Sequence, residues 1–176
     1  MTLMSVSATG FLRPTTDDQF ELVLHRHYDV KPETVWTVLT DSVECGRWMG
    51  TWEGDPSSGI VHMKMVAEEG DALQEVKILE CRAPEVVKVQ QGPADQPWTL
   101  EVHLAENGPT TELTFIQPMA RDFVLSMLSE VGPGWEYYMD RLVAAVAEED
   151  ANEIAWDDYY PALKEPYAVM ARAAEL

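Results

Sequence analysis

Basic residues are scarce in this chain of 176 residues. Only 12 residues are Lys or Arg whereas 31 are Asp or Glu, so the formal net charge is −19. Phosphate groups of nucleic acids are bound by clustered Lys and Arg, and this balance therefore excludes a nucleic-acid-binding protein. It also disfavours binding to anionic membranes.

Cysteines and long apolar runs are scarce as well. The two cysteines, Cys45 and Cys81, form neither a disulfide framework nor a metal-binding spacing, and they indicate reduced thiols in a cytoplasmic protein. No apolar run approaches the ~20 residues of a membrane-spanning helix, so membrane insertion is not expected. No signal peptide is expected, because no basic region precedes an apolar run near the N-terminus. Phosphate-binding glycine loops and nucleophile elbows are missing, and no cofactor is expected.

Apolar residues are sufficient for a globular core, since 46% of the chain is hydrophobic. The pattern predicts a flexible N-terminal tail over residues 1–18, one domain over residues 19–150 and an extension over residues 151–176. The extension contains Trp156, Tyr159 and Tyr160, which make it too aromatic for a solvated tail. We expect it to pack on the domain or on a second copy of the chain, which leaves a homodimer open.

Alternating apolar and polar residues predict a run of strands. In residues 20–28, Phe20, Leu22 and Leu24 share one face while the histidines lie on the other. Further strands are expected over residues 60–67, 73–82, 86–91, 98–104 and around 113–115. Asn107-Gly108 predicts a hairpin between the last two. Short strands joined by short turns indicate an antiparallel meander.

Helical patterns surround these strands. Pro32 and Glu33 suit the first turn of a helix, and a second short helix is expected to end at Trp48-Met49 with Gly50 as its cap. After the strands, a short helix is expected over residues 119–131, and residues 132–134 (GPG) separate it from a long helix over residues 134–150. The long helix has a wide apolar stripe made of Trp135, Tyr138, Met139, Leu142, Val143 and Val146. A long helix after a sheet must cover one face of it, which predicts an α+β fold.

Three segments carry a family resemblance. Residues 32–41 (PETVWTVLTD), 47–50 (RWMG) and 134–142 (GWEYYMDRL) resemble signatures of the SRPBCC superfamily. The most similar branch is named after the activator of the ninety-kilodalton heat-shock chaperone ATPase. The resemblance spans about residues 20–150. It implies a helix-grip fold: a curved antiparallel sheet of six to seven strands, wrapped around a long C-terminal helix, with two short helices after the first strand.

In such proteins an apolar cavity lies between the sheet and the long helix. The resemblance therefore implies a non-enzymatic binding protein for a small hydrophobic or amphipathic molecule. Carried over to this sequence, the ligand-binding residues are Trp36, Trp48, Met63, Met65, Trp98, Leu100, Phe115, Trp135, Tyr138 and Met139. Arg26 is added to them, because it shares the apolar face of its strand. Its guanidinium is expected either to anchor a ligand carboxylate or to pair with an acidic side chain, and the second alternative is favoured.

No catalytic or metal-binding residues are predicted. His25, His27, His62 and His103 are expected to point away from the core, because each alternates with core-facing apolar residues. The cysteines are interpreted as structural. Two other functions remain open: a cyclase-like or hydrolase-like enzyme that uses the same cavity, hinted at by Arg26, Tyr28 and Tyr138, and a chaperone-associated protein-interaction module.

Overall fold

An antiparallel sheet of eight strands dominates the computed structural model, which describes residues 6–66, 72–93 and 95–175. The strands are β1 (Phe11–Thr16), β2 (Gln19–Tyr28), β3 (Gly50–Glu53), β4 (Ile60–Met65), β5 (Gln74–Arg82), β6 (Val86–Gln91), β7 (Trp98–Asn107) and β8 (Thr110–Ala120). Their order in the sheet is β1-β2-β8-β7-β6-β5-β4-β3, so β1 and β3 form its edges.

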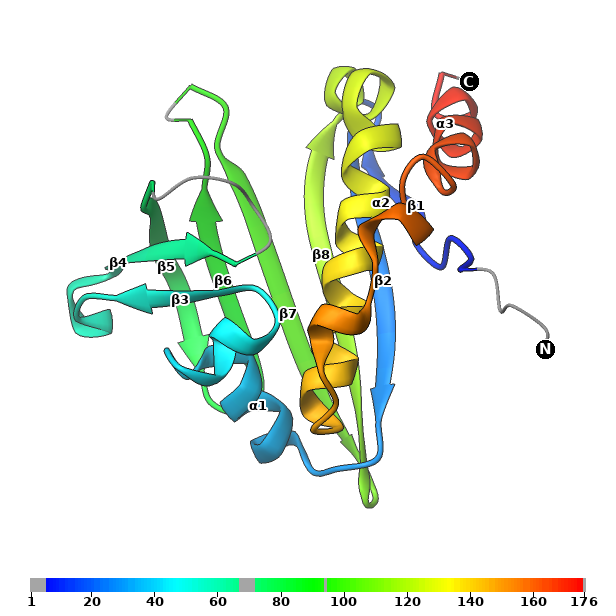
Figure 1. The fold of residues 1–176 in the computed structure, drawn as a ribbon. Helices are drawn as coiled ribbons and strands as arrows, with labels where there is room; N and C mark the ends of the chain where they lie inside the picture. The colour runs from blue at the N-terminus through cyan, green and yellow to red at the C-terminus, as the bar shows by residue number, and fades with distance from the viewer. Residues whose placement is uncertain (1–5, 67–71, 94, 176) are drawn as a thin grey trace, which may run out of the picture.

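Three α-helices and four short 3-10 helices accompany the sheet within the described residues. They are α1 (Pro32–Thr40), α2 (Arg121–Val146), α3 (Lys164–Ala173), η1 (Glu44–Arg47), η2 (Pro56–Ser58), η3 (Ala151–Glu153) and η4 (Trp156–Asp158). The long helix α2 runs alongside β2 and β8, and α3 lies on its outer side (Figure 1). A curved antiparallel sheet with one long helix confirms the predicted α+β helix-grip fold.

Two edge strands were not expected from the sequence, which is why the sheet exceeds the predicted six to seven strands. Residues 11–16 form β1 instead of part of a loose tail, while residues 1–5 of that predicted tail lie outside the described residues. Nearly every β1 side chain is exposed, so no alternation marks it; backbone pairing with β2 holds it in place. The two short helices consequently follow the second strand.

Gly50 starts β3 instead of only ending a helix. A Cβ atom there would lie 2.4 Å from the carbonyl oxygen of Lys64 on β4, so the close approach of the two strands requires glycine. The short helix before it, η1, ends at Arg47, and Trp48 and Met49 follow it as buried residues.

The central strands match their predicted patterns closely. Phe20, Leu22 and Leu24 of β2 are buried, whereas His25 and His27 are exposed. The predicted hairpin joins β7 to β8, with Gly108 at a φ of 61° in its turn. The ladder between β7 and β8 stops at the pair Glu101 and Ile116; beyond it β7 pairs only with β6, and β8 only with β2. The two strands therefore diverge beside α2 (Figure 1).

The prediction of two helices separated by residues 132–134 is wrong, because α2 is continuous from Arg121 to Val146. Pro133 lies inside it at the cost of one backbone hydrogen bond. Gly132 allows α3 to pack closely against α2, because a Cβ atom there would lie 2.5 Å from the Tyr167 ring of α3. Met119, expected in the first helix, is a buried residue of β8.

The C-terminal extension packs against α2. Tyr159, Leu163 and Tyr167 are buried and belong to the same core cluster as the sheet. This is one of the two arrangements that its aromatic content predicted. The division into a domain over residues 19–150 and an extension remains a prediction.

Candidate functional site

An apolar cavity of about 320 Å³ lies between α2 and the part of the sheet formed by β3 to β8. Six residues that the family resemblance nominated line it: Trp48, Met63, Leu100, Phe115, Trp135 and Met139. They come from the loop after η1, from three strands and from α2, so the cavity walls join segments far apart in the sequence.

Five nominated residues do not line the cavity. Trp36, Met65, Trp98 and Tyr138 belong to or pack against the core cluster. Trp98, for example, meets Phe123 edge to face at 5.6 Å between ring centroids. Arg26 is engaged on another face of α2. Alternation along a strand shows which face a side chain occupies, but it does not show whether that side chain borders empty space.

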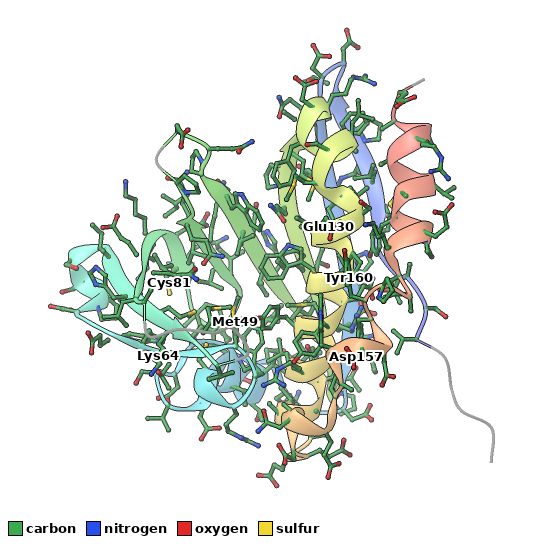
Figure 2. The ribbon with its side chains drawn as sticks, turned by 45° about the horizontal axis from the view of Figure 1, so that its top comes forward. Met49, Lys64, Cys81, Glu130, Asp157 and Tyr160 are labelled. Atoms are coloured by element: carbon green, nitrogen blue, oxygen red, sulfur yellow. The ribbon has the colours of Figure 1, made fainter. Side chains whose placement is uncertain are left out.

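Fourteen lining residues were not nominated from the sequence. Most are aliphatic residues of β4, β5 and β6 or residues around η1: Leu39, Thr40, Cys45, Met49, Trp52, Pro56, Val61, Val76, Ile78, Cys81, Val87, Val89, Gln91 and Val102. The alternation of Val87, Val89 and Gln91 along β6 was the available signal. Cys81 lies on β5, away from α2, and Met49 lies between η1 and β3 (Figure 2).

The indole N–H groups of the three tryptophans in the cavity wall donate to oxygen atoms of the protein. Trp48 Nε1 donates to the carbonyl oxygen of Val38 at 2.9 Å, and Trp52 Nε1 donates to that of Thr40 at 2.9 Å. Trp135 Nε1 donates to Gln117 Oε1 at 2.7 Å. The rings therefore present carbon surface to the cavity.

Few polar side chains border the cavity: Thr40, Cys45, Cys81 and Gln91. Thr40 Oγ1 donates to the carbonyl oxygen of Trp36 at 2.7 Å. Burial raises the pKa of the Cys45 thiol to about 12, although the N–H of Gly50 donates to its sulfur. Among the described lining residues there is no Asp, Glu, His, Lys, Arg or Tyr.

A β-bulge in β5 places Cys81 on the cavity wall. Ile78 pairs with Val89 and Cys81 pairs with Val87, so β5 has one residue more than β6 between these pairs. The bulge turns Cys81 toward the cavity, whereas Glu80 lies on the outer face. A regular strand would have placed the Glu80 carboxylate on the apolar wall.

Arg26 pairs with two acidic side chains of α2. Its Nη2 lies 3.0 Å from Glu136 Oε2, and its Nε lies 3.0 Å from Asp140 Oδ1. Burial alone lowers the pKa of Arg26, but the charges of Asp140 and Glu136 outweigh it and the pKa is raised. Of the two predicted roles, the structure shows the pairing with acidic side chains.

Glu136 is fully buried and accepts hydrogen bonds from three parts of the chain. The backbone N–H groups of Thr9 and Gly10 donate to Oε1 at 2.8 and 2.9 Å, and the Tyr167 hydroxyl donates to it at 2.6 Å. Asp140 Oδ2 accepts from the Tyr159 hydroxyl at 2.5 Å. We refer to this group as the Glu136 cluster: Thr9, Gly10, Arg26, Glu136, Asp140, Tyr159 and Tyr167. It ties both terminal segments to α2.

Arg26, Tyr28 and Tyr138, the residues on which the enzyme alternative depended, lie away from the cavity wall. Arg26 belongs to the Glu136 cluster, and neither Tyr28 nor Tyr138 lines the cavity. The buried Tyr28 hydroxyl has no hydrogen-bond partner among the described residues. The geometry therefore does not bring these three side chains together at the cavity.

The histidines provide no metal site in the described part of the chain. His25, His27 and His62 are exposed as predicted, and the partly exposed His103 has its Nε2 2.5 Å from Glu101 Oε1. No group of three potential ligands gathers in residues 6–66, 72–93 and 95–175. None of the helices described is both long and apolar enough to cross a membrane.

Solved structures share this fold. CalU16 from Micromonospora echinospora is 21% identical, with a TM-score of 0.69 over 92% of this chain and 95% of that one. EF2215 from Enterococcus faecalis, a conserved protein of unknown function, is 16% identical, with a TM-score of 0.73 over 95% of this chain and 92% of that one. DynU16, described as a putative protein in the dynemicin biosynthetic locus, is 13% identical, with a TM-score of 0.62 over 74% of this chain and 49% of that one.

At these identities the structural likeness establishes the fold alone. A comparison with curated proteins gives no match. The family described as "Activator of Hsp90 ATPase homolog 1-like protein" matches residues 29–147, which include all three signature segments and every lining residue of the cavity. The chain therefore belongs to the family of Activator of Hsp90 ATPase homolog 1-like proteins, within the SRPBCC superfamily.

Proposed function

We propose that this protein binds a small apolar molecule in the cavity between α2 and the sheet. The observation that carries the proposal is the cavity wall, which lines a partly open space of about 320 Å³ and presents carbon surface almost throughout. Ligand pockets typically measure ~300–1,000 Å³ and have mainly apolar walls with few polar groups. Its size favours a compact ligand.

Apolar burial supplies the driving force in this proposal. Each Å² of apolar surface removed from water contributes about 25 cal/mol. The indole N–H groups of Trp48, Trp52 and Trp135 are already bonded within the protein, so a ligand need not satisfy them. Met49, Met63 and Met139 add flexible side chains that adapt to ligand shape.

A cyclase-like or hydrolase-like reaction on the same cavity is supported less well. Acid–base catalysis needs a titratable group within hydrogen-bonding reach of the reacting atoms. Cys45 and Cys81 are the ionisable residues that line the cavity among those described, and the pKa of Cys45 is raised to about 12 by burial. A chaperone-associated interaction role rests on the family description alone.

The first experiment is native mass spectrometry of the purified protein, followed by organic extraction and identification of any bound molecule. We expect an adduct of a small apolar compound. The second step tests its location with the substitution Val89→Trp, which places an indole in the cavity. The matched control is Lys88→Trp, on the opposite face of the same strand.

Binding should be lost in the Val89→Trp variant and kept in the Lys88→Trp variant, with both folded by circular dichroism. A ligand that binds equally well to wild type and Val89→Trp would place the site elsewhere. Failure of any apolar compound to bind, with a clean apo mass, would contradict the proposed function.

A further inference from the structure

We infer that Gln91 binds the polar group of the ligand, and that this ligand is an uncharged apolar molecule with a carbonyl or hydroxyl group. The inference rests on the proposed function and specifies the chemistry of that same cavity. Its basis is the single amide side chain among the described residues of a mainly apolar wall.

Gln91 is the last residue of β6, and its backbone pairs with Trp98 of β7. Its side chain is partly buried and lines the cavity together with Val87 and Val89. No hydrogen bond joins this side chain to any residue that the structure describes. The side chain of the neighbouring Gln90, in contrast, points to the other face of the sheet, and its Nε2 donates to Thr99 Oγ1 at 3.5 Å.

The other polar groups of the wall are less suited to this role. The hydroxyl of Thr40 and the thiol of Cys45 each have a backbone partner. Cys81 is exposed and pairs with Val87, so it lies four residues from Gln91 along β6, about 13 Å in a strand. Among the lining residues that the structure describes, Gln91 is thus the polar side chain without a hydrogen-bond partner at its end of the wall.

A primary amide suits a neutral group. It has two N–H donors and one carbonyl acceptor, so it can donate to a ketone or exchange hydrogen bonds with a hydroxyl. Because Gln91 is only partly buried, its amide remains accessible to solvent, and the expected net gain on binding is that of an ordinary hydrogen bond. Such a bond changes affinity by about threefold to tenfold.

Charged ligands are disfavoured by the same wall. No Lys or Arg lines the cavity among the described residues, so a carboxylate placed against the apolar wall would have no counter-ion there. The net charge of −19 opposes an anion further. Selection for an uncharged molecule follows from both observations.

Three naphthalene compounds test the inference by isothermal titration calorimetry. The compounds are 2-ethylnaphthalene, 2-acetylnaphthalene and 2-naphthoate, which differ in one substituent. The variant is Gln91→Met, which keeps the side-chain length and removes the amide, and the matched control is Gln90→Met. The readout is the ratio of the affinities for the acetyl and ethyl compounds in each protein, which cancels general effects on packing or folding.

We expect this ratio to fall about threefold to tenfold in Gln91→Met and to stay unchanged in Gln90→Met. Wild type should bind the naphthoate at least about tenfold more weakly than the acetyl compound. If both neutral compounds bind but the ratio is unchanged in Gln91→Met, the role of Gln91 is wrong while cavity binding stands. Equal binding of the naphthoate would overturn the selection for uncharged ligands. If neither neutral compound binds wild type, the proposed function and this inference fail together.

Discussion

The two sides of α2 differ in how they are packed. On one side Trp135 and Met139 border a cavity of about 320 Å³. On the other side their sequence neighbours Glu136 and Asp140 belong to a cluster in which each carboxylate is paired and hydrogen-bonded. Residues one position apart point about 100° apart on a helix, so one segment builds both surfaces.

The two sides of α2 differ in whether their contacts fix the position of the helix. A buried carboxylate requires partners at defined distances, so the Glu136 cluster positions α2 relative to β2 and the terminal segments. Apolar contacts do not require particular distances or directions, so a cavity can remain between two apolar walls. In Figure 2, Glu130 and Tyr160 lie along α2 and the extension, whereas Cys81 lies among the strands away from α2. The Glu136 cluster therefore fixes α2 against β2 and the terminal segments, whereas the apolar side leaves a cavity.

The largest expected effect is in the Glu136 cluster. Glu136→Gln removes the charge that pairs with Arg26 and places an amide N–H₂ among backbone donors. We expect a loss of about 3–5 kcal/mol in the free energy of unfolding, because the buried Arg26 loses one of its two carboxylate partners and the new amide N–H₂ cannot accept from the surrounding donors. Urea denaturation measures it. The control, Glu130→Gln, changes a solvent-accessible pair with Lys164 and should cost far less. Similar losses in both variants would contradict the role of the cluster.

The next effect concerns the packing of α3 on α2. Gly132→Ala places a methyl group 2.5 Å from the Tyr167 ring, and we expect a loss of about 1–3 kcal/mol from overpacking. Gly134→Ala is the control, since nothing lies within 4 Å of its Cβ position. That variant should gain roughly 0.5–1 kcal/mol from helix propensity. Thermal unfolding followed by circular dichroism distinguishes the two. Stabilisation by both substitutions would show that Tyr167 does not pack tightly there.

Alkaline pH should weaken the Glu136 cluster. Burial, followed by Glu136, raises the pKa of Tyr167 above its ordinary value of 10.0. The hydroxyl thus stays protonated in the folded state while it ionises in the unfolded state, so its contribution is present below pH 10 and declines as the pH rises. Between pH 10 and 11 this amounts to up to about 1.4 kcal/mol for one group. Urea unfolding at both pH values should show a smaller decline for Tyr167→Phe than for wild type. An equal decline in both proteins would contradict this account.

The smallest effect is expected on the cavity side. Val89→Ile adds one methylene group to a wall that borders empty space. We expect a gain of up to about 0.8 kcal/mol, the value of one buried methylene group. Denaturant unfolding measures it, with Val23→Ile on the outer face of β2 as the filled-site control; Val23 is 1% exposed. The control should lose stability, since extra volume in a packed site is unfavourable. A loss in Val89→Ile as well would indicate a filled wall.

Much of the fold could be predicted from local patterns, because alternation and helical periodicity are recorded in neighbouring residues. The bounds of β6 matched the prediction, and the outward histidines of β2 followed from the same alternation. The edge strand β1 could not be found this way, because its exposed side chains show no pattern and its partner supplies the hydrogen bonds. The continuity of α2 was missed since Gly132 and Pro133 usually end helices.

Sequence alone determined the α+β helix-grip fold, the apolar stripe of the long helix and six of the residues that border the cavity, because these depend on periodicity and on short signature segments. Only the tertiary structure decided which side chains meet. The Glu136 cluster joins residues from Thr9 to Tyr167, and the β5 bulge turns Cys81 instead of Glu80 inward. Contacts between distant segments and the register between strands are set by packing of the whole chain, and no local pattern records them.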